Sequence, residues 1–185
     1  MSLIWGCNEP HYVPKPRMYP KVEYPTGEKV RVSSDFCDFS FEFPEYGTLR
    51  QETSFFDEKP KDPCWFDLNI ENLNAQLHCS YSPIKEGNFD QLVNDAFKLT
   101  AKHNSKAEFR KESLIENQEN NVYGLLFELE GPVATPIQFY LSDSTNHFFR
   151  ASLYYNDKVN PDSTQVITEF LFEDIQHLIE TFRWK

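Results

Sequence analysis

The chain has 185 residues, of which 29 are acidic and 18 are basic, and its formal net charge is -11 at pH 7. This charge argues against a nucleic-acid-binding protein, because the phosphate backbone would repel it. Aromatic residues make up 16% of the chain, which excludes a disordered protein, and no apolar run approaches the ~18 residues of a membrane-spanning helix. We therefore expect one folded domain, attached to any membrane through a lipid.

The N-terminus carries a pattern typical of bacterial lipoproteins. The tetrapeptide Ile4-Trp5-Gly6-Cys7 places apolar and small residues directly before a cysteine, as at the end of a signal peptide whose cysteine carries diacylglycerol. Only three residues precede this tetrapeptide, whereas a signal peptide needs a basic region and a longer apolar region. We interpret residues 1–6 as a signal-peptide remnant, and the alternative is a chance glycine–cysteine pair.

A proline-rich segment follows, with the sequence YVPKPRMYP from position 12. Its prolines fix φ and keep the preceding residues out of the helical region, so the segment is predicted to be extended. An extended segment loses little entropy on binding, and tyrosines anchor interfaces. The residues predicted to bind a partner are Tyr12, Lys15, Pro16, Arg17 and Tyr19. The alternative is that the segment packs back on the acidic domain, with Arg17 paired to a carboxylate.

After a predicted tether over residues 7–28, alternating apolar and polar residues predict strands in a single domain spanning residues 29–185. The first two predicted strands are residues 30–32 and 39–43, and residues 49–58 have no clear pattern. Residues 66–70 and 75–81 alternate on either side of the turn-forming residues 71–74. This is the clearest predicted hairpin.

Helical spacing of apolar residues predicts a helix that begins at Asn88 and fades near His103. Strands are then expected at residues 109–115, weakly patterned, and at residues 122–130, 137–141 and 149–155. A last helix begins at Asn160-Pro161-Asp162-Ser163 and runs to Phe182, with Asp174 as the one polar break in its apolar stripe. Hairpin-length links favour antiparallel pairing, so we predict an α+β fold, a mostly antiparallel sheet covered by two helices, loosely similar to the Mog1/PsbP-like arrangement.

The sequence contains no recognisable catalytic or metal-binding motif. Its five histidines are scattered, and it lacks a G-x-S-x-G motif, a P-loop, a dinucleotide-binding glycine pattern and a calcium loop. His78 and Cys79 are adjacent on a predicted strand, where neighbours point to opposite faces and cannot hold one ion. We expect Cys79 in the core and His78 at the surface. The prediction is a protein without enzymatic activity, cofactor or metal.

Four segments occur in a distinctive order along the chain. They are Y-x-P-K-P-R-x-Y shortly after Cys7, FEFPEY from position 41, CWFD from position 64, and the C-terminal region from Asp162 to Arg183-Trp184-Lys185. Together they resemble the GldD family of gliding-motility lipoproteins, over essentially the whole chain after Cys7. One departure is Met18, where a glycine is expected. The resemblance implies that Cys7 carries the lipid and that the protein faces the periplasm, supporting gliding motility through contacts with the gliding and type IX secretion machinery.

Cys37 and Cys64 each precede an aromatic-rich strand. In an oxidising periplasm they could form a disulfide that closes a loop of about 27 residues and stabilises the fold by ~3 kcal/mol. The alternative is a pair of buried thiols.

A second functional hypothesis is a periplasmic ligand-binding or accessory domain with a pocket between sheet and helix. A deep cleft lined by converging polar groups would favour this second hypothesis. A filled core with an exposed aromatic or proline-rich patch would favour protein contacts.

Overall fold

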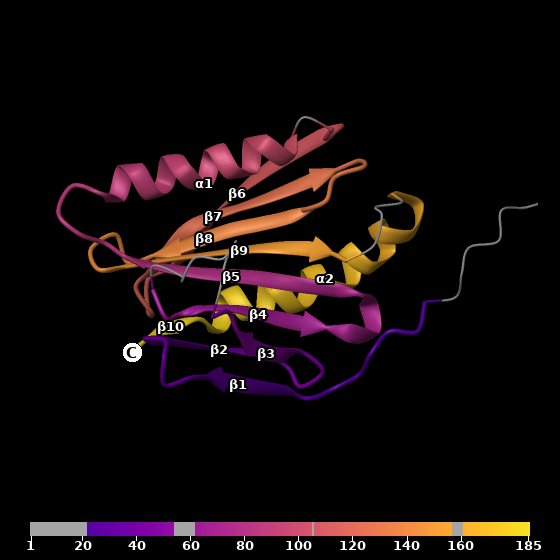
Figure 1. The fold of residues 1–185 in the computed structure, drawn as a ribbon, viewed down its shortest axis with the longest axis horizontal. Coiled ribbons are helices and arrows are strands. Elements are labelled where there is room, and N and C mark those ends of the chain that lie inside the picture. The colour runs from indigo at the N-terminus through magenta and orange to yellow at the C-terminus, as the bar shows by residue number, and fades with distance from the viewer. Residues whose placement is uncertain (1–21, 54–61, 105, 157–160) are drawn as a thin grey trace, which may run out of the picture.

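The computed structural model describes residues 22–53, 62–104, 106–156 and 161–185. Its largest element is a seven-stranded sheet in the order β3-β4-β5-β9-β8-β7-β6, with every neighbouring pair antiparallel (Figure 1). The strands are β3 (Thr48–Gln51), β4 (Trp65–Ile70), β5 (Ala75–Pro83), β6 (Phe109–Asn117), β7 (Val122–Glu130), β8 (Ile137–Ser142) and β9 (His147–Tyr155).

A smaller sheet of three antiparallel strands stands beside the large one. It consists of β1 (Lys29–Ser33), β2 (Phe39–Pro44) and the short β10 (Arg183–Trp184), with β2 in the middle. The C-terminus of the chain therefore returns to pair with a strand near its beginning. Lys185 completes this closure, because its backbone N–H donates to the carbonyl of Asp38 at 2.8 Å.

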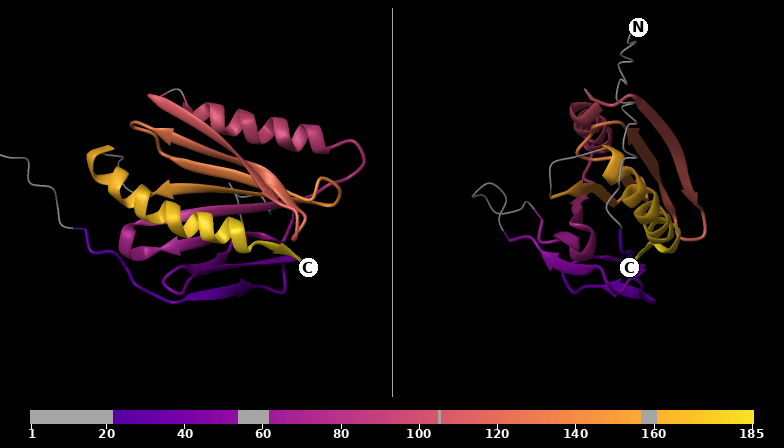
Figure 2. Two further views of the ribbon diagram at one scale, coloured as in Figure 1. Left: turned by 180° about the vertical axis from the view of Figure 1, so that it is seen from behind. Right: turned by 90° about the vertical axis from the view of Figure 1, so that its right-hand side faces the viewer.

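Two helices, α1 (Phe89–Asn104) and α2 (Pro161–Thr181), lie on opposite faces of the seven-stranded sheet (Figures 1 and 2). The alternation along β7 shows this directly. The Phe127 ring packs edge-on against Phe97 of α1 with centroids 5.2 Å apart, whereas neighbouring Leu126 belongs to the core beneath α2. Helix α2 also contacts β2, so it packs against both sheets.

The main core is aromatic and brings together residues distant in sequence. Phe39 of β2 packs against Phe182 and Phe149 with both centroid distances 4.9 Å, and Phe149 lies 5.1 Å from Phe182. All three side chains are 2% exposed or less. Burying each contributes roughly 1.5–3 kcal/mol, so this cluster joins β2, β9 and the end of α2 strongly.

The structure confirms the predicted α+β class, the antiparallel pairing and both helices. The predicted 71–74 turn is a short 3₁₀ helix, η1 (Glu71–Leu73), followed by Asn74 in a left-handed conformation (φ 49°). Cys79 is fully buried in the core and His78 points to the other face of the sheet, where its Nδ1 lies 2.6 Å from an Asp67 carboxylate oxygen. The separation into two sheets and the existence of β10 were not predicted.

Cys37 and Cys64 are joined by a disulfide in the structure, with their Cα atoms 5.0 Å apart. Both cysteines are buried, at 4% and 1% exposure. Cys37 leads into β2 of the small sheet and Cys64 leads into β4 of the large sheet. The bond therefore links the two sheets covalently at the end where their aromatic side chains meet.

Candidate functional site

Helix α2 has one flank that is filled by the small sheet and its connections. His177 Nε2 lies 3.1 Å from a Glu42 carboxylate oxygen, and the backbone N–H of Glu42 donates to the Thr181 hydroxyl at 2.9 Å. Farther along the helix, the Tyr24 ring packs on Phe170 with centroids 4.6 Å apart. We call this side of α2 the closed flank. Because Tyr24 precedes residue 29, residues just before the predicted domain boundary already contact the domain.

The single polar break in the α2 stripe has a structural partner on the closed flank. Asp174 is 8% exposed, and the Tyr46 hydroxyl donates a hydrogen bond to its carboxylate. Burial, together with this neighbouring carboxylate, raises the pKa of Tyr46 well above its usual value. The tyrosine therefore keeps its proton and serves as the donor that a buried carboxylate requires.

The opposite flank of α2 is hollow, and we call it the groove. Toward the N-terminal half of α2 it encloses a hollow of about 510 Å³ between the helix and the ends of β6, β7 and β8. The apolar residues that line it are Leu129, Val133, Pro136, Ile137 and Phe172. The left view of Figure 2 shows α2 running obliquely across the sheet, with β6 and β7 above it in that view.

A second hollow of about 490 Å³ lies toward the C-terminal half of α2, between the helix and the end of β6. Gln176 lines both hollows, so they meet at this residue. Near the C-terminal end of the helix, the Asn117 side-chain amide donates to the carbonyl of Glu180 at 3.2 Å and connects β6 to α2. The groove thus follows much of the length of α2.

Acidic side chains dominate the lining of the groove. No lysine or arginine lines either hollow within the described part of the chain, whereas eight glutamates do. They are Glu108, Glu116, Glu119, Glu128, Glu130, Glu169, Glu173 and Glu180. Of these, Glu128 forms an ion pair with Lys111 at 2.7 Å, and no other shows an ion pair among the described residues. The groove therefore presents negative charge around an apolar floor.

This arrangement can attract cations and hold apolar side chains, but it offers no recognisable catalytic constellation. In the described ranges, no three histidine, cysteine or acidic side chains are grouped so that they could hold a metal ion. Two unit charges 4 Å apart attract by ~1 kcal/mol in water and ~4 kcal/mol near a protein surface. Several glutamates along one groove would therefore favour a ligand that carries several positive charges.

The face of the sheet that α1 covers in part carries a separate polar group. The Arg150 guanidinium donates to the Gln138 side-chain oxygen at 2.8 Å, and burial lowers the pKa of Arg150. Gln138 is 1% exposed and also donates to Thr135 at 3.1 Å. These groups satisfy one another across β8 and β9, so we assign them to packing beneath α1.

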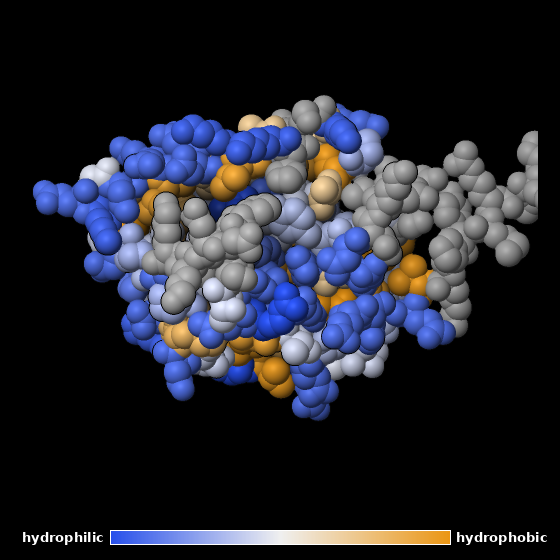
Figure 3. All heavy atoms as spheres, in the orientation of Figure 1, coloured by the Kyte–Doolittle hydropathy of each residue, from blue (hydrophilic) through white to orange (hydrophobic). Residues whose placement is uncertain are grey.

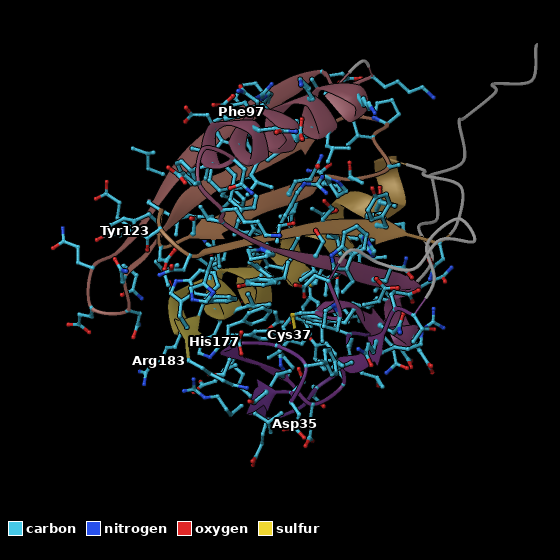
Figure 4. All side chains as sticks on the ribbon, turned by 60° about the vertical axis from the view of Figure 1, so that its left-hand side comes forward. Asp35, Cys37, Phe97, Tyr123, His177 and Arg183 are labelled. Atoms are coloured by element: carbon cyan, nitrogen blue, oxygen red, sulfur yellow. A yellow bond between two sulfur atoms is a disulfide. The ribbon has the colours of Figure 1, made fainter. Side chains whose placement is uncertain are left out.

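The residues predicted from sequence and those of the groove do not coincide. The predicted anchor and partner-binding residues lie outside the described residues; they are Cys7, Tyr12, Lys15, Pro16, Arg17 and Tyr19. The groove was missed because its glutamates come from β6, β7 and α2, far apart in sequence. The one sequence signal for the groove was the weak apolar pattern of residues 109–117, which reflects a strand at an exposed sheet edge. Figure 4 labels Tyr123 on β7, the neighbouring strand.

Comparisons with known proteins identify the family. The model of the family described as Gliding motility lipoprotein GldD matches residues 9–184. No curated protein matches the chain. The solution structure of cyanobacterial PsbP (CyanoP) from Synechocystis sp. PCC 6803 is similar at 13% sequence identity and a TM-score of 0.48, covering 87% of this chain and 95% of that chain. Within the described ranges, no helix has the length and apolar character needed to cross a bilayer. The chain belongs to the GldD family of gliding motility lipoproteins.

Proposed function

We propose that this protein supports gliding motility as a non-enzymatic envelope lipoprotein that binds other proteins of the gliding and type IX secretion machinery. In this account Cys7 carries the lipid and the domain faces the periplasm. The observation that supports protein binding is the groove, which combines apolar side chains with glutamates that lack ion-pair partners in the described structure. An interface of this kind takes apolar anchors at its centre and opposite charge at its rim.

Photo-crosslinking in gliding cells tests this proposal. A photoreactive residue at Gln176, where the two hollows meet, should crosslink to a protein that gliding requires. The matched control is the same residue at Lys29, which is exposed on β1 beside the closed flank. The same crosslinked products from both positions would contradict a partner at the groove.

A small cationic ligand is a second candidate occupant, since each hollow has the volume of an ordinary small-molecule site. This corresponds to a ligand-binding domain with its pocket between sheet and helix. Spermidine serves as the probe. Under this alternative it should raise the melting temperature at micromolar concentration and compete with crosslinking from Gln176. Stabilisation only at millimolar concentration, with crosslinking unchanged, would exclude the alternative.

The lipid anchor is tested in the native full-length protein. Cys7→Ser should release the folded domain into the soluble periplasmic fraction, because the substitution removes the proposed lipid attachment and leaves the described core unchanged. A variant that still fractionates entirely with membranes would place the anchor elsewhere.

The N-terminal segment is proposed as a second contact region, through Tyr12, Lys15, Pro16, Arg17 and Tyr19. The test combines Lys15→Glu with Arg17→Glu. Lost gliding with an unchanged melting temperature supports partner binding. A large fall in melting temperature would instead show that the segment packs on the acidic domain.

A further inference from the structure

The geometry points to strand β6 as the place where a partner docks, by adding an extended, lysine- or arginine-rich segment of its own chain to the edge of the seven-stranded sheet. This inference rests on the proposed function and specifies the chemistry of the partner. Backbone hydrogen bonds to β6 would hold the segment, and its basic side chains would reach the glutamates of the groove.

Strand β6 is a long edge that the described structure leaves unpaired on one side. It stands last in the strand order, pairs with β7 over nine residues from Phe109 to Asn117, and has no second neighbour in the described sheet. The opposite edge strand, β3, has four residues. Proteins usually keep edge strands short or covered, because an open edge pairs with other chains. By its short length β3 is protected from pairing with other chains, whereas the nine-residue β6 is not.

The edge strand β6 also exposes apolar side chains that its own fold does not use. Leu114 is 79% exposed and Phe109 is 54% exposed, the two highest values among the large apolar side chains of the described residues. Both belong to β6. On the face drawn in Figure 3, apolar residues lie in scattered groups among hydrophilic ones. Leu114, in the middle of β6, is more exposed than any other large apolar side chain of the described residues.

The groove lies on one face of this edge. The β6 residues Ser113 and Asn117 line the second hollow, toward the C-terminal half of α2, together with Gln176 and Glu180 of that helix. An added strand would lie about 4.8 Å beyond β6, and alternate side chains would point to the same face. Every second side chain of the partner would thus project toward α2, where lysine or arginine meets negative charge and a methylene stem can cover apolar surface.

Charge selects among the occupants of such an edge. A second copy of this chain would bring its own acidic groove and a further net charge of -11 toward the first. Four ionic groups are paired on or beside β6, since Arg110 pairs with Glu112 at 2.6 Å and Lys111 pairs with Glu128 at 2.7 Å, whereas Glu116 of β6 shows no ion pair in the described structure. A basic segment therefore complements the unpaired glutamates, whereas self-association adds repulsion.

The test measures binding of a synthetic nine-residue peptide of alternating lysine and valine, with capped ends, to the 185-residue chain by calorimetry. A groove variant carries Glu116→Gln, Glu173→Gln and Glu180→Gln, all at exposed positions. A control variant removes the same charge at exposed sites away from the groove: Glu28→Gln, Glu71→Gln and Glu86→Gln. We expect the groove variant to bind the peptide about tenfold more weakly and the control variant to bind it as the wild type does.

A second peptide isolates the backbone contribution. It has the same side chains, but alternate backbone nitrogens carry methyl groups, which removes the N–H donors of one edge and keeps every charge. Strand addition predicts that this peptide does not bind, and that the unmodified peptide slows hydrogen exchange of β6 amides. Equal binding of both peptides, or equal loss in the groove and control variants, would overturn the inference.

Two further outcomes would also overturn it. A dimer in sedimentation analysis that the peptide dissociates would make a second copy the occupant. Markedly tighter peptide binding by the Lys15→Glu, Arg17→Glu variant would make the chain's own basic segment the occupant. Failure of strand addition is separable from failure of the proposed function, because gliding of the groove variant is measured independently of the peptide.

Discussion

The two flanks of helix α2 differ in how the chain treats them. On the closed flank, the Tyr46 hydroxyl donates to Asp174 of the helix, and Thr181 of the helix accepts from a backbone N–H of β2. The aromatic cluster around Phe182 fills the space between the helix and the small sheet. On the groove side, the same helix faces hollows lined by glutamates without ion-pair partners in the described residues. One helix thus serves stability on one side and leaves charge and apolar surface free on the other.

This difference indicates that the residues of the groove do not serve the stability of the fold. A monomer optimised for stability alone would place lysines among the groove glutamates, since like charges at close range repel. The groove keeps its unbalanced charge, and it lies beside the unprotected edge of β6. Substitutions on the closed flank should therefore reduce stability strongly, whereas those in the groove should reduce function and change stability much less.

The largest expected effect comes from a matched pair of phenylalanines at α2. Phe182 is 0% exposed on the closed flank, whereas Phe172 is partly buried and lines the groove. Phe182→Ala should lower the free energy of unfolding by about 3–5 kcal/mol, because it leaves a cavity in the aromatic cluster. Phe172→Ala should cost roughly 1 kcal/mol. Urea unfolding measures both, and equal losses would show that the two flanks are packed alike.

The disulfide should give the next largest effect. Cys37→Ser combined with Cys64→Ser removes the link between the sheets and should lower the free energy of unfolding by ~3 kcal/mol. Cys79, which is buried and free, should react with alkylating reagents only after unfolding, and burial also raises its pKa. Non-reducing peptide mapping of the wild type checks the pairing, and a Cys37 or Cys64 thiol that alkylates in the native protein would contradict it.

A smaller effect is expected at Tyr46, where a hydroxyl donates to the buried carboxylate of Asp174. Tyr46→Phe removes this donor and should cost about 1–3 kcal/mol. Because the folded state raises the pKa of Tyr46, its contribution is fully present below the unfolded-state pKa near 10 and is lost as pH rises beyond it. Stability of the variant should therefore fall less steeply above pH 10 than that of the wild type. If the stabilities of the variant and the wild type fell equally steeply above pH 10, Tyr46 would not be the donor to Asp174.

The predicted elements were largely correct because they follow from local patterns. Residues 39–43 and 75–81 alternate between core and surface, and the residues from 167 to 182 follow helical spacing, so their burial could be read from the chain. The short β10 could not be predicted, because two residues carry no periodicity. The groove is likewise a product of tertiary structure, since β6 and α2 are brought together from opposite ends of the C-terminal half.

Asp174 shows a limit of the same method. Its place in an apolar stripe was visible from sequence, but its partner Tyr46 is 128 residues away and no local pattern connects the two. For the cysteines, composition left a bridge and two thiols open, because only the distance between Cα atoms distinguishes them.

The most direct test of the account is gliding by cells that carry the groove variant, Glu116→Gln, Glu173→Gln and Glu180→Gln, in place of the native protein. These side chains are exposed, so the free energy of unfolding should change by less than about 0.5 kcal/mol. The account predicts lost or strongly slowed gliding in cells with normal protein levels, and normal gliding with the control variant Glu28→Gln, Glu71→Gln and Glu86→Gln. Normal gliding with both variants would contradict the central claim that the groove beside α2 carries the function.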